Sequence, residues 1–336
     1  PAAEAEAAPA PAPRPKPEKG SELRLKEGKE ISGASLQSPH DPDATYGHKG
    51  KGYEVQVAET CEESNPYQVI TGIAVNGANE SDQHATGSMI ALLQGCGLSP
   101  LVLLADTGYG SGENIVQSAL HGVDLYAPVH DPNAPPPKDY WAAPVEPSVP
   151  ASTPLDPDGN PTKEADSTRT LAPEPPLGLD AFDFNTTFDQ LLRCPNGHAP
   201  VEQEVRAVPI PYRAIFDADR CASCPLADRC PTRRIKSGQR VLRWKAAKAA
   251  TATRQQEQRQ ATFKDGYKIR SGIESTNAEF KGRHGAKKLR VRGLQRVSMM
   301  VCLKATALNV KRAVQHHTAL LAGLVEPKPG EDALAA

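Results

Sequence analysis

The 336-residue sequence lacks any hydrophobic run long enough to cross a bilayer, and no apolar segment of the signal-peptide type stands near its beginning. These absences leave a cytoplasmic protein as the expectation. The sequence also lacks an excess of either charge, because 39 Lys and Arg residues face 40 Asp and Glu residues. Global charge therefore favours no particular partner, and the length allows one large domain or two modest ones.

Cysteine is distributed too unevenly for a disulfide framework. Of the seven cysteines, an odd number, four lie within residues 194–230, which is typical of a metal cluster in a reducing compartment. Cys194 precedes His198 by four residues, and a Cys221-x2-Cys224-x5-Cys230 string follows. Four thiolates would close a tetrahedral Zn²⁺ site, with His198 as the reserve ligand. The alternative is that the thiols are reduced and buried as small hydrophobic groups.

Positive charge is concentrated in one stretch near the carboxyl end. Residues 264–312 contain thirteen Lys or Arg residues but only three acids, Asp265, Glu274 and Glu279, an excess of ten positive charges. Such a stretch on an otherwise neutral protein indicates an interface for nucleic acid. A solvated helical face is the alternative, although such faces usually mix charges of both signs.

Composition divides the chain into six segments. Proline-rich stretches open the chain and recur at residues 130–179, where few apolar residues could form a core. The predicted boundaries are a disordered Ala/Pro-rich linker at 1–35, the first part of a catalytic domain at 36–129, a Pro-rich loop or insertion at 130–190, a Cys-rich zinc module at 191–240, a helical basic part of the catalytic domain at 241–322, and a disordered tail at 323–336.

An α/β pattern occupies the first part of the catalytic domain. Residues 52–59 and 67–75 alternate and carry β-branched side chains, which predicts a hairpin. A helix follows at 82–95, with Asp82 as its N-cap and Met89, Leu92 and Leu93 on its inner face. The apolar run 101–105 predicts a central buried strand. A short helix at 112–120 and a strand at 123–128 complete the order.

Asp106 stands where the apolar run ends and a glycine-rich turn begins. An acid at the carboxyl end of a central strand occupies the usual location of an α/β active site. Alternatively, Asp106 caps the helix that begins near Ser111.

A second candidate cluster is the string Tyr267-x2-Arg270-x3-Glu274-x6-Lys281. On one helix these four residues would fall within an arc of about 60°, beside a core-facing stripe of Ile269, Ile273 and Phe280. A carboxylate between two cations and a phenol is suited to hold a divalent metal near phosphate. The alternative is an ordinary ion pair between Arg270 and Glu274 on the helix surface.

Both motifs resemble those of the DDE transposases of bacterial insertion sequences. The Tyr-Arg-Glu-Lys string looks like the motif around the last acid of that family, the Asp-x-Gly-Tyr string at Asp106 resembles the second acid, and CPNGH and CASCPLADRC resemble the family's Cys-rich insertion. The resemblance implies an α/β ribonuclease H-like fold, here lacking its first strand, with an inserted Cys-rich module and a helical basic C-terminal part.

The resemblance also implies roles for individual residues. Asp106 and Glu274 would be catalytic acids that bind Mg²⁺ or Mn²⁺, and the partner would be double-stranded DNA at transposon ends and target, bound by a nucleoid-associated homodimer. The residues expected to bind DNA are Tyr267, Arg270, Lys281, Arg283, Lys287, Lys288, Arg290 and Arg292.

The first acid of the family pattern has no match. No Asp-Gly-Thr or Asp-Ser-Thr string precedes residue 52; Asp41 and Asp43 stand in a Pro-broken turn, and Glu59 is a weak substitute. We therefore expect the first strand and its Asp to lie upstream of Pro1, so that this chain alone binds DNA without cutting it. A non-catalytic DNA-binding remnant with a zinc module, or a metal-dependent nuclease of the same fold, are the competing functions.

Overall fold

The computed structural model describes residue 32 and residues 35–132, 175–204 and 211–325. Most of the predicted linker 1–35, the greater part of the Pro-rich segment 130–190 and most of the tail 323–336 lie outside the described residues. The described residues contain both helices and strands, in agreement with a mixed α/β class. Within the described residues, no helix is long and apolar enough to span a membrane.

The predicted hairpin is confirmed. Strand β2 (Gly50–Glu59) pairs antiparallel with β3 (Ile70–Gly77), with Val55 opposite Val75, and the register shifts between Ala58 and Glu59. The short strand β1 (Thr45–Gly47) pairs only with the beginning of β2. Most of β2 therefore has one strand neighbour, on its β3 side.

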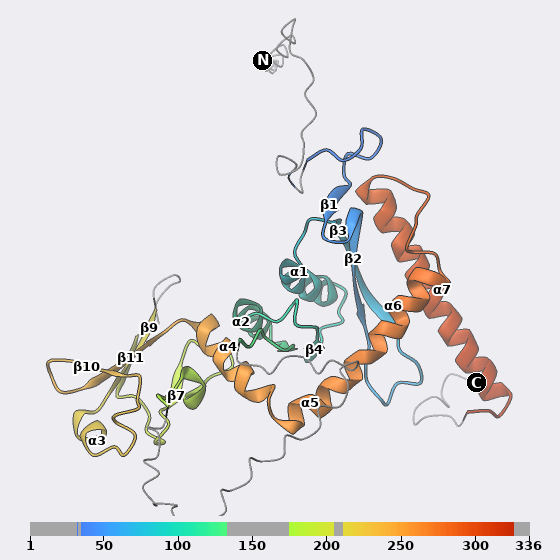
Figure 1. Ribbon diagram of the computed structural model, residues 1–336. Helices are drawn as coiled ribbons and strands as arrows, with labels where there is room; N and C mark the ends of the chain where they lie inside the picture. The colour runs from blue at the N-terminus through green and yellow to red at the C-terminus, as the bar shows by residue number, and fades with distance from the viewer. Residues whose placement is uncertain (1–31, 33–34, 133–174, 205–210, 326–336) are drawn as a thin grey trace, which may run out of the picture.

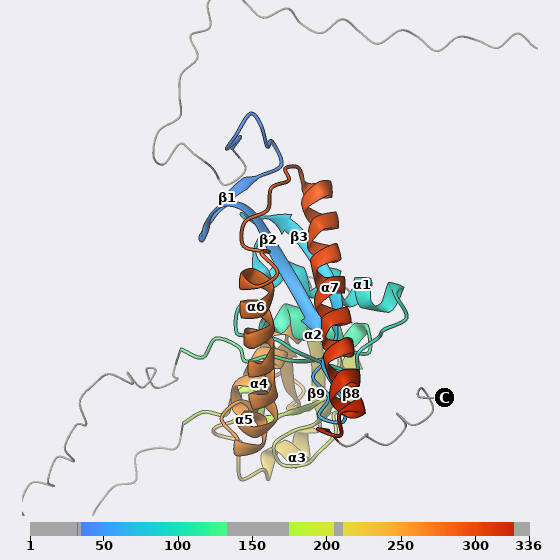
Figure 2. The ribbon, with the colours of Figure 1, turned by 90° about the vertical axis from the view of Figure 1, so that its right-hand side faces the viewer.

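Two helices cover the opposite faces of this hairpin (Figures 1 and 2). Helix α1 (Asp82–Gly95) packs Met89 and Leu93 against Ala58, while the long helix α7 (Leu294–Leu321) packs Val301 and Leu308 against the other face. Successive strand side chains alternate between faces, which is how one strand serves both helices.

Two details of α1 differ from the sequence prediction. Ser81, with an extended backbone, is the N-cap, and its Oγ accepts a hydrogen bond from the Gln83 N–H at 3.4 Å. Asp82 is instead the first helical residue, and its side chain points toward Gln56 of β2. Leu92 is 37% exposed and does not face the core.

Strand β4 (Val102–Leu104) is not the buried central strand that its apolar run predicts. It pairs in parallel with β5 (Asp124–Tyr126), which α2 (Gly112–Leu120) connects to it. In the described part of the chain β4 has no strand on its other side, and Leu101 and Val102 are 84% and 46% exposed. The sequence predicted a central strand because this run is apolar, but the side chains of Leu101 and Val102 are not covered by other parts of the described structure.

A helical arm runs from the Cys-rich module back to α7 (Figure 1). It consists of α4 (Ala246–Glu257), α5 (Ala261–Tyr267), the 3₁₀ turn η3 (Lys268–Ser271) and α6 (Gly272–Gly282). The single helix expected over 267–281 is therefore interrupted by the 3₁₀ turn Lys268–Ser271, after which α6 begins at Gly272. Of the expected core-facing stripe, Phe280 is buried at 3% exposure, whereas Ile269 and Ile273 are only half-buried.

The Cys-rich module is a separate small β-structure with its own core. Its core side chains are Phe182, Leu191, Phe216 and Trp244, and the Trp244 Nε1–H donates to the Phe188 carbonyl at 2.8 Å. The module contains a four-stranded sheet in the order β10 (Arg233–Arg234), β11 (Arg240–Trp244), β9 (Tyr212–Phe216), β8 (Glu202–Glu204), the pair β6 (Asp183–Phe184) and β7 (Leu191–Arg193), and the short helices η2 (Leu179–Ala181) and α3 (Ala218–Ala222).

Candidate active site and cysteine cluster

Asp106 is separated from the end of β4 by Ala105 alone, and its side chain closes the turn that follows. Its Oδ1 accepts the Gly108 N–H at 2.9 Å. Helix α2 is capped by Ser111, whose Oγ accepts the Asn114 N–H at 3.1 Å. The alternative in which Asp106 caps that helix is therefore wrong, and one carboxylate oxygen remains without a hydrogen bond from its own turn.

Tyr267 ties the helical arm to the residue before Asp106. Its hydroxyl donates to the Ala105 carbonyl at 2.9 Å across 162 residues of sequence. Burial raises the pKa of Tyr267, the nearby Arg270 lowers it, and the carboxylates of Asp106 and Glu274 raise it further. The charges of both predicted acids therefore act on the Tyr267 phenol.

Glu274 forms the ion pair that its spacing also allowed. Arg270 Nη2 lies 3.0 Å from Glu274 Oε1, and the Arg270 guanidinium lies 5.5 Å from the centre of the Tyr267 ring. The Glu274 side chain is 68% exposed, so such a pair contributes little to stability. The carboxylate is open to solvent and to any ligand that approaches this face.

Sequence reasoning missed a group of acids on the other side of Asp106. A methyl group built on Gly108 would lie 3.0 Å from Asp106 Oδ1 and 3.5 Å from Asp82 Oδ2, so these carboxylates are neighbours. The Gln56 Nε2–H donates to Asp82 Oδ1 at 3.0 Å, and the Tyr109 hydroxyl donates to Gln56 Oε1. The strand alternation that places Gln56 on the α1 face was the available signal.

The nearby acids also affect the pKa values of their neighbours. Burial raises the pKa of Tyr109 well above its usual range, and the charges of Asp82, Asp106 and Glu54 add to the effect. The pKa of Glu54 is itself raised, first by burial and then by Asp82. The described residues nevertheless contain no group of three or more His, Cys, Asp or Glu side chains placed to hold a metal ion. Mg²⁺ takes few protein carboxylates and completes its shell with water and phosphate.

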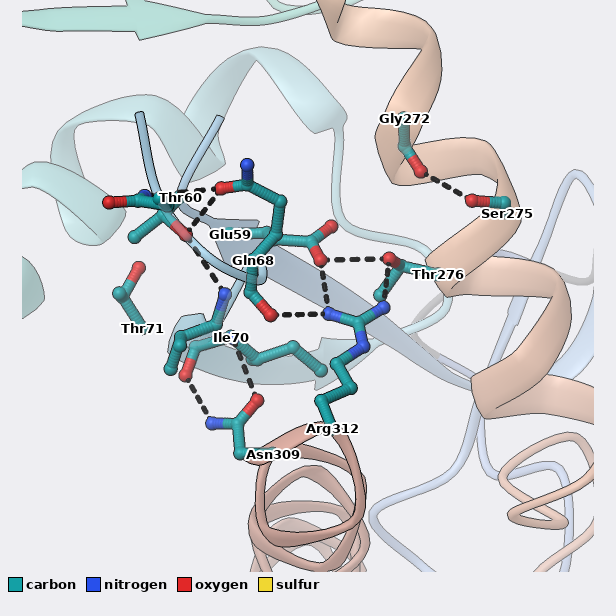
Figure 3. A network of polar contacts seen from close by, with 12 residues as sticks. Glu59, Thr60, Gln68, Ile70, Thr71, Gly272, Ser275, Thr276, Asn309 and Arg312 are labelled. Atoms are coloured by element: carbon teal, nitrogen blue, oxygen red, sulfur yellow. Dashed lines mark hydrogen bonds and ion pairs between the residues drawn. The ribbon is translucent and has the colours of Figure 1, made fainter. Parts of the chain in front are cut away.

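Glu59, the weak substitute for the first acid, is a structural residue (Figure 3). Its side chain is 6% exposed and forms an ion pair with Arg312 of α7, and Thr276 Oγ1–H donates to its Oε1 at 2.9 Å. Arg312 also donates to the Gln68 carbonyl at 2.9 Å. The carboxylate is already neutralised and hydrogen-bonded, so it is not available to a metal.

Asp41 and Asp43 fasten the amino-terminal turn to the beginning of α7. Asp41 Oδ1 accepts from the Tyr53 hydroxyl and from the Gly293 N–H, and Asp43 Oδ2 accepts the Leu294 N–H at 2.8 Å. Two carboxylates at a helix N-terminus are stabilising. Their role is therefore structural as well.

The basic stretch divides into paired and exposed cations. Lys268, Lys311 and Arg312 form ion pairs with Asp265, Glu279 and Glu59. The remaining candidates at the end of α6 and in its connection to α7 are all exposed: Lys281, Arg283, Lys287, Lys288, Arg290 and Arg292. We call these six residues the cationic connection.

The four module cysteines line one small cavity of about 30 Å³, together with His198. Burial raises the pKa of Cys221, Arg240 lowers it, and the thiols of Cys230, Cys194 and Cys224 raise it again. The spacing therefore predicted a true convergence of thiols. The cavity is close to the volume of one water molecule, although the thiols are not arranged as a formed metal site.

Comparison with known proteins adds one finding. Residues 193–314, rather more than a third of the chain, match the family model described as Transposase DDE domain. This match supports a DDE transposase. It spans most of the Cys-rich module, the helical arm with Glu274, and most of α7, whereas Asp106 lies outside it. No curated protein and no solved structure matches the chain.

Proposed function

We propose that the protein is a DDE transposase that binds double-stranded DNA through the cationic connection and presents Asp106 and Glu274 to a divalent metal beside the DNA phosphate. The observation that carries the proposal is the Tyr267 hydrogen bond to Ala105, since it joins the Glu274 helix to the Asp106 turn. We propose further that the active form is a cytoplasmic, nucleoid-associated homodimer.

Bound Mg²⁺ or Mn²⁺ would align and activate the attacking hydroxyl and stabilise the departing oxygen of the phosphodiester. The chain's own residues have defined tasks. Asp106 and Glu274 supply carboxylate oxygens, and Arg270 could exchange its single contact with Glu274 for a DNA phosphate, because a guanidinium also binds phosphate strongly. Tyr267 holds the two acids in register through Ala105.

The cationic connection would supply affinity without reading sequence. Its six side chains are exposed on one stretch of chain that leads from Glu274 to α7. Contacts of Lys and Arg with phosphate position a protein on the duplex and release counterions. Lys281 at the end of α6 is the member nearest to Glu274 along the chain.

Metal-directed backbone cleavage tests the acidic pair without requiring DNA chemistry. Fe²⁺ replaces Mg²⁺ in the 336-residue chain, and peroxide with ascorbate generates radicals that cut the polypeptide near the ion. We expect cuts near residues 106 and 274, both lost in Asp106→Asn and in Glu274→Gln. Glu279→Gln on the same helix is the matched control and should retain the cuts. Cuts near residues 82 and 106 alone would contradict the role of Glu274.

A non-catalytic DNA-binding protein is the second candidate. It is favoured by the engagement of Glu59 with Arg312 and by the lack of a three-ligand acidic group within the described residues. This candidate predicts salt-sensitive DNA binding with no Mg²⁺-dependent nicking. Nicking by the purified chain that disappears in Glu274→Ala would exclude it.

The cysteine cavity is proposed to hold a structural Zn²⁺ through Cys194, Cys221, Cys224 and Cys230. The support is their common cavity and their mutual effect on the pKa of Cys221. Metal analysis should find about one Zn²⁺ per chain, and Cys224→Ser should reduce it. Cys302→Ser, at an exposed position on α7, is the control and should leave the zinc content unchanged.

A further inference from the structure

A second cluster of positive charge, separate from the cationic connection, lies on the β10–β11 hairpin and at the start of α4. Residues 229–248 contain eight Lys or Arg residues and no Asp or Glu. Six of the eight are exposed, and none of these six forms an ion pair with a described residue. We call the six the hairpin cations: Arg233, Arg234, Lys236, Arg243, Lys245 and Lys248.

The four-stranded sheet keeps some of these cations where they oppose its own pairing. Arg234 lies directly opposite Arg240 in the β10–β11 ladder, and Arg243 lies directly opposite Arg213 in the β11–β9 ladder. Like charges at directly opposed positions destabilise a sheet. Glu204 neutralises Arg213 through an ion pair of 2.7 Å, whereas no acid among the described residues pairs with Arg234 or Arg243.

The first turn of α4 shows the same conflict. Lys245 is its N-cap and Lys248 follows within the turn, although the helix macrodipole favours negative charge there. The turn has no acidic residue, and Lys245 makes no side-chain capping hydrogen bond. Natural proteins break local rules of this kind mainly at functional sites. The hairpin cations are therefore better explained by a polyanionic partner than by the stability of the module.

The side chains around the hairpin cations indicate which polyanion is bound. Single-stranded nucleic acids stack on exposed aromatic groups, but Tyr212 and Trp244, the aromatic residues of these two strands that are nearest, pack at the module core. Protein partners are usually anchored by large apolar or aromatic groups, and residues 229–248 expose none. Lys and Arg side chains without such groups suit the phosphate backbone of a duplex.

We propose that the hairpin cations form a second surface for double-stranded DNA. The β10–β11 hairpin lies on the side of the molecule remote from α6 and α7 (Figure 1), so that the two surfaces would contact different stretches of a duplex. The inference rests on the proposed DNA binding and extends it, because the Cys-rich module then binds the substrate as well as packing beside the α/β half.

The salt dependence of DNA affinity tests the second surface. The probe is a duplex of about 40 base pairs, roughly four helical turns. Arg243→Gln with Lys245→Gln should lower the slope of log affinity against log salt by about 2. Removing these charges relieves the repulsion from Arg213 and the conflict with the α4 dipole, so the double variant should unfold at the same or a higher urea concentration. Arg259→Gln, at a cation paired with Asp131, is the control and should retain the slope.

Lysine acetylation gives an independent test. The duplex should slow the modification of Lys236, Lys245 and Lys248 severalfold in the 336-residue chain. Lys49, whose side chain is 79% exposed between β1 and β2, is the control and should react at the same rate with and without DNA. Polyglutamate and a single-stranded oligonucleotide of equal charge should protect the three lysines less than the duplex does.

The possible failures of the two proposals are distinguishable. An unchanged slope in the Arg243 and Lys245 variant, with a lower slope in Lys287→Gln with Lys288→Gln, would overturn the second surface and leave the cationic connection standing. Protection by polyglutamate or by the single strand equal to that by the duplex would also overturn it, and would assign the surface to an acidic protein or to unpaired nucleic acid. A chain that binds no duplex at low salt would overturn both proposals.

Discussion

The Cys-rich module and the α/β half of the molecule, which carries β2 to β5, differ in how completely they are packed. In the module, Phe182, Leu191, Phe216 and Trp244 form a core in which each of these four side chains is 3% exposed or less. In the α/β half, β2 and β4 line a groove of about 910 Å³, and Val102 is 46% exposed. The module thus has a well-buried core of its own, whereas the β2–β3 and β4–β5 pairs of the α/β half belong to separate sheets.

From this difference we infer that the module contributes to stability and that the α/β half is suited to binding. A closed core gives stability through burial and close packing. In the α/β half, buried polar contacts also join segments that are far apart in the sequence. Arg254, at 6% exposure, donates to the Leu125 and Ala127 carbonyls, and Arg312 joins Glu59 to α7.

The largest expected effect is in the module core. Trp244→Ala removes a buried indole and leaves the Phe188 carbonyl without its donor, so it should destabilise the protein by about 3–5 kcal/mol. Hydrogen exchange should accelerate in residues 211–216 and 240–249. Unchanged exchange in β2 and β3 would show that the two regions unfold separately, and equal acceleration there would break the comparison.

Breaking the Glu59–Arg312 ion pair should destabilise the protein by roughly 3 kcal/mol. This value is near the lower limit for a buried pair, because Arg312 keeps some solvent access. Arg312→Met leaves the buried Glu59 carboxylate without its ionic partner, so that of these two contacts only the hydrogen bond from Thr276 remains. Urea unfolding should show the loss, and the double variant Glu59→Gln with Arg312→Met should recover much of it. A double variant no better than the single one would show that packing of Arg312, and not its charge, holds α7.

Charge removal in the cationic connection should alter DNA binding and leave folding unchanged. Lys287→Gln with Lys288→Gln should lower the slope of log affinity against log salt by about 2, because each phosphate contact releases close to one counterion. The loss should be similar for unrelated DNA sequences. Lys268→Gln, whose partner is Asp265, is the matched control, and an equal change there would refute a specific role for the connection.

The smallest expected effect is the pH dependence of the Glu279–Lys311 pair. The hydrogen bond from Lys311 lowers the pKa of Glu279 below its usual value of about 4.5. The pair's stabilisation is therefore complete above that value and is lost as pH falls through the lower folded pKa. It should be less than about 1 kcal/mol. Stability measured between pH 6 and pH 3 should fall slightly less in Glu279→Gln than in the unaltered protein.

Local sequence patterns predicted the separate elements well. The hairpin, α1, α2 and the convergence of four cysteines follow from alternation, capping residues and short spacings, all of which act over a few neighbouring residues. The i,i+4 spacing of Arg270 and Glu274 allowed the ion pair that the structure shows. In each case the deciding interactions lie close together in the sequence or repeat with the period of a helix or strand.

Only the tertiary structure determines which side chains and strand edges lie together, and which of them already have hydrogen-bond or ion-pair partners. The sequence could not show that the carboxylates of Glu59, Asp41 and Asp43 are already engaged, whereas in the structure Arg312, Gly293 and Leu294, more than 250 residues away, donate to their oxygens. It marks 101–105 as a central strand, yet β4 has one strand neighbour among the described residues. The physical reason is that solvation and pairing of a side chain or strand edge depend on contacts between distant segments, which no local pattern encodes.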